Sequence, residues 1–261
     1  MDQPQGFEKC DEQENLLVYR LKKSLYGLKQ APRAWFEKFR SCLTRSLGCT
    51  ASLADSSLYF WEKEGCKVYV MVYVDDVVVT GDDDVSIDKV VQEIIVIFSL
   101  KDLGDLSFFL GMNVRRVKQG IILSQRKHIL EVLETAKMLD ANPAPTPMVT
   151  SPVLTSEDGD PCSNPTLYRQ IVGILQHVCN TRPDIHFAVN KVSQFMQQPT
   201  EKHWKVVQRI LKYLKGMIDH GLFFDFTVSP TTLVGYSDSY WGSKSEDWRS
   251  TSGHCLFLVG I

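Results

Sequence analysis

Two adjacent carboxylates lie in the most hydrophobic hairpin-like stretch of the chain, "KVYVMVYVDDVVVTGDDD". Asp75 and Asp76 separate two runs of β-branched and aromatic residues, which predicts a hairpin with both aspartates at its tip. An Asp-Asp pair is common in a turn that water reaches, because the like charges repel. The alternative is a metal site, since Mg²⁺ binds carboxylate oxygens together with substrate phosphates. The residues alone leave both interpretations open.

If the pair binds metal, phosphoryl transfer is the chemistry it suits. Two metal ions about 4 Å apart assist the in-line attack of a hydroxyl on a phosphoryl group, one activating the nucleophile and one holding the leaving oxygen. A further carboxylate from elsewhere in the fold usually bridges such ions. Asp75 and Asp76 would therefore form an incomplete site by themselves.

A second feature is a basic segment in a chain whose formal net charge is only -2. Its cations are opposed only by Glu37 and could bind a polyanion or simply form a solvated helix face. They are Arg20, Lys22, Lys23, Lys29, Arg33, Lys38, Arg40 and Arg45.

The cysteines and the N-terminus bear on the compartment. The 7 cysteines form no CxxC pair and are odd in number, so neither a zinc knuckle nor a secreted disulfide framework is indicated. The N-terminus is acidic and lacks the apolar part of a signal peptide, and no run approaches the roughly 18 apolar residues of a membrane span. We expect an intracellular protein that is not secreted and does not contact a membrane.

Strand and helix patterns alternate in the first half of the chain. The spacing predicts a helix within residues 31–48, two strands around Glu64-Gly65, a helix within 85–98 and a strand pair around Gln119-Gly120. This order suits an antiparallel sheet backed by helices on one face.

A proline-rich segment, residues 142–165, marks the main break in the pattern and predicts an extended connector. Helical patterns follow within 183–196 and 201–216, and strand-like segments return from Thr231. The second helix carries basic residues that a solvated face explains most simply, with nucleic-acid contact as the alternative. They are Lys202, Lys205, Arg209, Lys212 and Lys215.

Several segments together resemble one family. "YVDD" at Tyr73 to Asp76 resembles the catalytic hairpin motif of reverse transcriptases. Further blocks, in the family's order along essentially the whole chain, resemble the Ty1/copia class of LTR retrotransposon Pol polyproteins. These blocks are "LKKSLYGLKQAPRAW", "DLGDLSFFLGMNV", "ILSQRKHILEVLETAKML", "PTPM", "TRPDIHFAVNKVSQFM", "RILKYLKG" and "GYSDSYWGSKSEDWRSTSGHCLFLVG".

The resemblance implies an α+β fold. It predicts a polymerase palm with a ferredoxin-like antiparallel sheet and helices, a helical thumb or connection, and a partial RNase H-like β segment. The corresponding parts are reverse transcriptase fingers and palm at 1–142, a connector at 143–165, thumb and connection at 166–230, and the start of RNase H at 231–261.

The resemblance also implies site residues, a cofactor and partners. Asp75, Asp76 and Asp238 would be catalytic metal ligands, the last in the RNase H part, with Mg²⁺ or Mn²⁺ as the ion. The partners would be an RNA template, a DNA primer, their RNA/DNA hybrid and deoxynucleotide triphosphates, in a cytoplasmic virus-like particle or the nucleus. The oligomeric state is left open.

The substrate-facing positions implied by the resemblance fall into three groups. The residues that would line the incoming nucleotide are Tyr26, Gly27 and Gln30. Those that would face phosphates are Lys29 and Arg33. Those that would support the primer end are Phe109, Leu110, Gly111 and Met112.

Two departures from the family pattern affect the expected activity. The family's other polymerase aspartate lies upstream of a segment resembling "MDQPQGF". The surroundings of Asp2, Asp11 and Asp55 do not resemble the strand that carries this aspartate in the family. The family's further RNase H acids would lie beyond Ile261. Losing one bridging carboxylate at a cost of about 4 kcal/mol would slow the reaction about 10³-fold. We therefore expect a reverse transcriptase by ancestry that is inactive or poorly active alone. The alternative is a non-enzymatic remnant that keeps nucleic-acid binding.

Other classes have less support. An RNA-binding module on a similar sheet would carry the aromatic signature K/R-G-F/Y-G/A-F-V-x-F/Y, which the sequence lacks. A protease or integrase is disfavoured because the sequence contains no DTG or DSG triplet and no paired His and Cys zinc arrangement.

Overall fold

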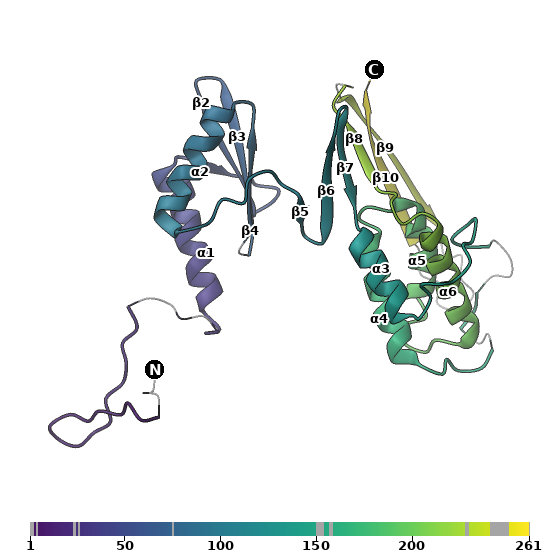
Figure 1. The fold of residues 1–261 in the computed structure, drawn as a ribbon, viewed down its shortest axis with the longest axis horizontal. Coiled ribbons are helices and arrows are strands. Elements are labelled where there is room, and N and C mark those ends of the chain that lie inside the picture. The colour runs from purple at the N-terminus through teal and green to yellow at the C-terminus, as the bar shows by residue number, and fades with distance from the viewer. Residues whose placement is uncertain are drawn as a thin grey trace. The chain divides into compact units, whose positions relative to one another are not determined.

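The computed structural model divides the chain into two compact units, each with its own hydrophobic core. Unit 1 comprises Met1–Asp105 and unit 2 comprises Leu106–Ile261. Figure 1 shows the elements within each unit. The residues that the structure describes are 3, 5–22, 25, 27–74, 76–149, 154–156, 159–227, 230–240 and 251–260.

Unit 1 contains a four-stranded antiparallel sheet in the order β1-β2-β3-β4. The predicted strand pair around Glu64-Gly65 is confirmed, since these residues form the β2–β3 turn with φ angles of 54° and 86°. The strands and helices are β1 (Thr50–Ala51), β2 (Leu58–Lys63), β3 (Cys66–Tyr73), β4 (Asp76–Gly81), α1 (Ala31–Ser41), the π-helical turn η1 (Cys42–Ser46) and α2 (Asp84–Phe98).

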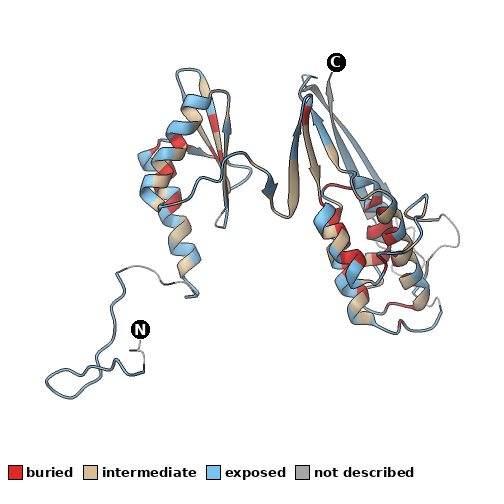
Figure 2. Ribbon diagram, in the orientation of Figure 1, coloured by how far each residue is buried: buried red, intermediate tan, exposed pale blue. Residues whose placement is uncertain are grey.

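One face of this sheet is buried by hydrophobic side chains from the strands and the two helices. Val68, Val70 and Val72 alternate along β3 toward the core, where they join Phe39 of α1 and Ile94 of α2. Figure 2 shows the buried residues on these elements. Each buried valine stabilises the fold by roughly 1.5–3 kcal/mol relative to an exposed one. The helices therefore hold the sheet through the side chains of alternate strand residues.

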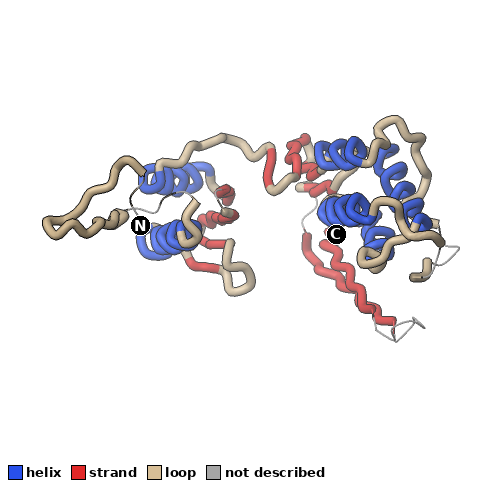
Figure 3. The backbone as a smooth tube through the Cα atoms, turned by 90° about the horizontal axis from the view of Figure 1, so that it is seen from below, coloured by secondary structure: helices blue, strands red, loops and turns tan. Residues whose placement is uncertain are grey.

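Unit 2 contains a second four-stranded antiparallel sheet, in the order β5-β6-β7-β8, and a two-stranded ladder of β9 and β10. Its helices gather into a bundle, and Figure 3 shows them in blue. The elements are β5 (Phe108–Phe109), β6 (Met112–Val117), β7 (Gly120–Ser124), α3 (Arg126–Thr135), α4 (Pro165–Val178), the 3₁₀ turn η2 (Pro183–Ile185), α5 (His186–Ser193), α6 (Glu201–Gly216), β8 (Leu222–Asp225), β9 (Pro230–Tyr240) and β10 (Thr251–Gly260).

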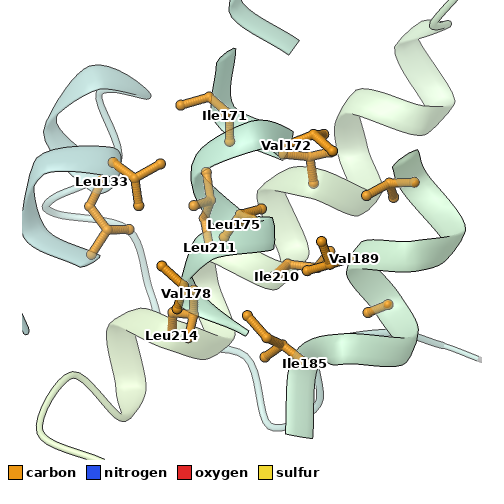
Figure 4. Close-up of a cluster of buried hydrophobic side chains, with 14 of the residues drawn as sticks. Leu133, Ile171, Val172, Leu175, Val178, Ile185, Val189, Ile210, Leu211 and Leu214 are labelled. Carbon is orange, nitrogen blue, oxygen red and sulfur yellow. The ribbon is translucent and has the colours of Figure 1, made fainter. Parts of the chain in front are cut away.

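The core of unit 2 lies between its helices. Ile171 and Leu175 of α4 pack with Ile210 and Leu214 of α6, as Figure 4 shows. The predicted helices within 183–196 and 201–216 are confirmed. Across the part of the chain that is described, the helices are too short or too polar to cross a membrane.

The two predicted strand pairs do not share one sheet in the described part of the chain. The second pair, β6–β7, is completed instead by β8, which follows α6. Two glycines permit this approach: a Cβ on Gly120 would lie 1.8 Å from the Phe224 carbonyl oxygen, and one on Gly221 would lie 2.0 Å from the Leu123 carbonyl oxygen. The expectation of a single sheet is therefore corrected to two.

The proline-rich segment lies against unit 2 and does not separate the two units. The Ala144 N–H donates to the Lys212 carbonyl (3.2 Å), and the Cys162 N–H donates to the Pro199 carbonyl (2.9 Å). The mixed α/β architecture with antiparallel sheets is compatible with the expected α+β class. The palm, thumb and RNase H-like assignments and their boundaries stay predictions.

Candidate functional site

The acidic hairpin is formed by β3 and β4, which pair in antiparallel register from Val68↔Gly81 to Tyr73↔Asp76. Only two residues, Val74 and Asp75, connect Tyr73 to Asp76, so the turn is as tight as a hairpin allows. Asp75 itself lies outside the described residues. Asp76 is exposed and starts β4 directly opposite Tyr73, which is also exposed.

The residues behind the tip explain why the hairpin forms despite its charges. Val70 pairs with Val79 and Val72 pairs with Val77, and all four belong to or pack against the unit 1 core. Because paired residues of antiparallel strands share one face of a sheet, Asp76 and Tyr73 lie on the face opposite these valines. The valines anchor the hairpin, and the carboxylate stays in solvent.

The backbone at the tip is strained. Val74 has a φ angle of 52°, in the left-handed region that β-branched residues rarely adopt. This conformation costs an L-amino acid about 1–2 kcal/mol. Strain of this kind persists where the surroundings impose it and is concentrated at functional sites. The sequence analysis did not identify Val74, although a β-branched residue in a two-residue turn is an indication of such strain.

The metal ligands at the tip can be described for one carboxylate, that of Asp76. In the part of the chain that the structure describes, no group of three or more His, Cys, Asp or Glu side chains is arranged to hold a metal ion. The oxygen donors are the type that Mg²⁺ or Mn²⁺ prefers, but Asp76 contributes only part of a ligand set.

The basic segment leads into helix α1, whose N-terminus lacks a side-chain cap. Gln30 is the N-cap residue but makes no capping hydrogen bond, and the first turn contains no acidic residue. The Ala31 N–H donates to the Leu28 carbonyl (2.9 Å) and Pro32 has no N–H, so it is mainly the positive end of the helix dipole that favours an anion here. Lys29 is exposed beside this N-terminus, and Gly27 has a φ angle of 88°. The uncapped helix end was not recognised in the sequence.

Arg33 is placed differently from the simple expectation that it faces phosphates. Its Nε donates to Glu37 Oε1 at 2.9 Å, on an exposed face of α1. An exposed pair of this type contributes at most about 1 kcal/mol, so an anion can compete for the guanidinium. Tyr26, the other predicted nucleotide-lining residue, lies outside the described residues.

The predicted primer-end residues form a second tight turn, in unit 2. Phe109 pairs with Met112 across the turn, and Leu110 and Gly111 have φ angles of 49° and 79°. Two consecutive left-handed residues are typical of a type I′ hairpin turn, in which glycine is favoured and leucine is strained. The structure therefore brings all four residues together.

A histidine pair that the sequence did not reveal packs against this turn. A Cβ on Gly111 would lie 2.8 Å from His128 Cε1 and 3.2 Å from His177 Cε1. The two imidazole rings stack with centroids 5.3 Å apart. Buried Gln125 lies 2.6 Å from His177 Nδ1 and 2.8 Å from Thr181 Oγ1. These contacts hold the turn from α3 and α4, which are distant in sequence.

Asp238, the predicted RNase H carboxylate, is an exposed residue of β9. It lies opposite Gly253 of β10, and residues 241–250 are outside the described part. Asp76 and Lys29 are positioned by unit 1, and Phe109 to Met112 and Asp238 are positioned by unit 2.

Unit 2 also contains a cleft of about 650 Å³ between the β6–β7 hairpin and α3. Arg126 forms an ion pair with Asp219, and Lys127 pairs with Glu131 at 3.9 Å. The remaining charges on its lining, Arg115 and Glu134, also have opposite signs. A lining whose charges cancel is poorly suited to a polyanion.

Two thiols, buried Cys49 and half-buried Cys179, have raised pKa values. Burial raises the pKa of each of them to about 11. Both thiols stay protonated near neutral pH and are weak nucleophiles.

Comparison with known proteins identifies the family. The family model described as "Reverse transcriptase (RNA-dependent DNA polymerase)" matches residues 1–150. The retrovirus-related Pol polyprotein from transposon RE2 of Arabidopsis thaliana is 43% identical over 99% of this chain. That from transposon TNT 1-94 of Nicotiana tabacum is 36% identical over 100% of this chain. The putative transposon Ty5-1 protein YCL074W of Saccharomyces cerevisiae is 32% identical over 99% of this chain and 83% of its own length.

The lengths of these relatives differ from that of this chain. The chain spans 17% of the RE2 polyprotein and 20% of the TNT 1-94 polyprotein. No solved structure matches it. The sequence matches nonetheless cover nearly all of its residues, and they confirm the resemblance noted in the acidic hairpin and the blocks around it. The chain belongs to the reverse transcriptase family of Ty1/copia-type retrotransposon Pol polyproteins.

Proposed function

We propose that the chain carries the metal-binding hairpin and part of the nucleic-acid surface of an RNA-directed DNA polymerase. The observation that carries this proposal is the β3–β4 tip, where a two-residue turn with a left-handed valine exposes Asp76 beside Tyr73. A turn that served only to reverse the chain would favour glycine or asparagine at Val74. The strained tip is therefore better explained by the positioning of the two carboxylates.

Asp75 and Asp76 are the residues that would hold Mg²⁺ or Mn²⁺. The ion would neutralise phosphate oxygens and lower the barrier to attack of the primer hydroxyl. The protein's part would be to keep two hard oxygen donors on a rigid element, and the valines of β3 and β4 anchor the strand that carries Asp76. Asp238 is proposed as a carboxylate of a separate RNase H-like β segment.

The substrates proposed are an RNA template, a DNA primer, their hybrid and deoxynucleotide triphosphates. Lys29, Arg33 and the uncapped N-terminus of α1 would contact phosphates, with Tyr26, Gly27 and Gln30 near the incoming nucleotide. Phe109 to Met112 would support the primer end, on the turn that His128 buttresses. In this assignment the fingers and palm comprise residues 1–142, which include the β1–β4 sheet, and the thumb and connection comprise residues 166–230, which include most of α4 and all of α5 and α6.

The polypeptide of 261 residues is proposed to bind template–primer but to extend it slowly. In the family pattern a further carboxylate completes the metal site, and its loss would correspond to about 10³-fold in rate. The exposed Lys29 beside the N-terminus of α1 favours a second candidate function, a non-enzymatic remnant that binds nucleic acid without extending it.

Primer extension on an RNA template with Mg²⁺ tests activity directly. We expect extension at or slightly above background, and any residual extension should disappear in Asp75→Asn and Asp76→Asn. Asp88→Asn removes an exposed carboxylate of α2 and serves as the matched control. Robust extension that Asp75→Asn abolishes would show that the metal site is complete and would refute the proposed deficit.

A metal-binding measurement gives a readout besides activity. Mn²⁺ should broaden the amide resonances of Tyr73 and Val77 in the wild-type chain and in Asp88→Asn, because a paramagnetic ion bound at the tip lies close to both. The effect should vanish in the Asp75→Asn, Asp76→Asn double variant. Equal broadening in all variants would remove the carboxylate pair as a metal site.

A further inference from the structure

The segment between α3 and α4 begins by running along helix α6. Pro143 packs against Gly216 at the end of this helix, since a Cβ added to the glycine would lie 3.1 Å from Pro143 Cβ. The Ala144 N–H donates to the Lys212 carbonyl at 3.2 Å, about one turn earlier in the helix. The segment therefore follows α6 from its C-terminal end, and Thr146 comes next along it.

Thr146 lies beside the guanidinium of Arg209. The Arg209 Nη2 donates to Thr146 Oγ1 at 2.9 Å. The Arg209 Nε is buried and has no hydrogen-bond partner among the residues that the structure describes. A buried donor without an acceptor is unfavourable. The guanidinium is thus held next to the threonine hydroxyl with a further donor that an added acceptor could satisfy.

The helix places more positive charge near this contact. Lys205 and Lys212 are exposed and lie about one turn before and after Arg209. The one acidic residue of α6, Glu201, lies two turns from Arg209. The segment itself contributes no charged residue between positions 141 and 149. An anion added to the threonine would therefore be attracted to this part of α6.

The sequence around Thr146 suits a protein kinase. This residue belongs to the "PTPM" block and is followed directly by Pro147, and proline-directed kinases act on a serine or threonine in that position. Proline favours an extended conformation in the residue before it, and kinases bind their substrates in extended form. Thr146 is exposed and lies in neither a helix nor a strand.

We propose that Thr146 is phosphorylated by a proline-directed protein kinase and that Arg209 binds the phosphate. The Thr146 hydroxyl attacks the γ-phosphorus of a nucleoside triphosphate. The Oγ–P bond forms as the bond from this phosphorus to the bridging β-phosphate oxygen breaks, the hydroxyl proton is released, and the nucleoside diphosphate leaves. This inference does not depend on the proposed polymerase function.

The product fits the site that is already formed. A phosphothreonine carries a charge of about −1.5 to −2 near neutral pH and three acceptor oxygens. An arginine binds a phosphate group through two parallel hydrogen bonds, and Nη2 and Nε of Arg209 are one such pair of donors. Phosphorylation therefore satisfies the buried Nε and fastens the segment to α6.

Phosphorylation of the whole folded chain tests the site. The chain is incubated with a mitogen-activated protein kinase and ATP, and mass spectrometry of its peptides locates the phosphate. We expect phosphate on Thr146 in the wild-type chain, its loss in Thr146→Ala, and its retention in Thr146→Ser, which keeps a hydroxyl before Pro147. Circular dichroism confirms that each chain is folded before the reaction. Absence of phosphate from this position in the wild-type chain would refute the proposal.

A phosphorus NMR titration tests the role of Arg209. Ser151 and Ser229 also precede proline, so the chains carry Ser151→Ala and Ser229→Ala to leave one such site. The pKa of the second phosphate ionisation, about 6 in a free phosphothreonine, should fall to about 5, because the guanidinium favours the dianion. Arg209→Gln should return this pKa to about 6, and Arg209→Lys, which keeps the charge but not the fork, should give an intermediate value.

The matched control for this titration removes a positive charge from another helix. Lys127→Gln neutralises an exposed lysine of α3 and should leave the phosphate pKa at about 5. The same pKa in the wild-type chain and in Arg209→Gln would overturn the assignment of Arg209 as the phosphate-binding residue. An equal rise in Lys127→Gln and Arg209→Gln would overturn it as well, because the effect would then be that of net charge.

Discussion

Replacing Gly111 with alanine should destabilise unit 2 for two reasons. Alanine rarely adopts the backbone conformation of this position, and the position has no space for a side chain. Its φ angle of 79° is left-handed, which costs alanine about 1–2 kcal/mol. The added Cβ would lie 2.8 Å from His128 Cε1, and relieving such overpacking costs about 1–3 kcal/mol. The sum of about 2–5 kcal/mol corresponds to a fall of roughly 4–20 °C in the unfolding midpoint of a domain of this size.

Thermal unfolding followed by circular dichroism measures this change, and hydrogen exchange of the β6 amides assigns it to unit 2. Gly173→Ala is the matched control: this glycine lies in α4 with open space around it, so alanine should stabilise the helix by about 0.5–1 kcal/mol. Adding His128→Ala to Gly111→Ala should recover the part of the loss that comes from the clash. If Gly111→Ala and Gly173→Ala shift the midpoint equally, the reasoning about the turn is wrong.

Three further predictions concern single contacts. Asp184→Asn should destabilise unit 2 by about 2 kcal/mol, measured by urea unfolding, because nearly buried Arg182 loses the negative charge beside it and one of its two hydrogen bonds, of 2.9 and 2.7 Å, to this carboxylate. Burial raises the pKa of Asp184, but hydrogen bonds from Arg182 and Tyr213 outweigh burial and leave the pKa lowered. The stabilisation of the folded state by the Asp184 carboxylate is therefore complete above the ordinary pKa of about 4 and is lost as pH falls through the lower folded value. Unfolding midpoints measured below pH 5 would reveal this loss. Thr200→Ala should cost about 1 kcal/mol and shorten α6 by amide exchange, because it removes the capping box. Val74→Gly should raise the midpoint of unit 1 slightly, since relief of about 1–2 kcal/mol of strain exceeds the entropy cost of glycine; a lower midpoint would contradict strain at the tip.

The elements that the sequence predicted correctly are those fixed by local spacing. Glu64-Gly65 was predicted to lie between two strands because an aromatic-rich run precedes it and a valine-rich run follows it, and both residues adopt left-handed conformations. The helix within 201–216 followed from the helical spacing of apolar residues such as Val207, Leu211 and Leu214, which are buried in α6. In each case neighbours in the sequence are also neighbours in space, so periodicity contains the relevant information.

The features that the sequence did not predict depend on contacts between distant residues. The pairing of Ile122 with Phe223 joins segments about a hundred residues apart, and no local pattern specifies it. The approach of His128 and His177 to Gly111 likewise depends on how α3 and α4 pack. The predicted roles of Lys29 and Asp238 remain untested for a different reason, because they concern ligands and reaction chemistry rather than packing.

The position of β8 has a consequence for how unit 2 is made in the cell. Strand β7 ends at Ser124 and its partner β8 begins at Leu222, so the ribosome synthesises all of α3 to α6 between them. Since chains are synthesised at about 5–20 residues per second, one edge of β7 stays unpaired for roughly 5–20 s before β8 has been made. During that interval β7 exposes unpaired backbone groups that can pair with another chain. Newly made chains should therefore be most prone to aggregate after α3 forms and before Asp225 emerges.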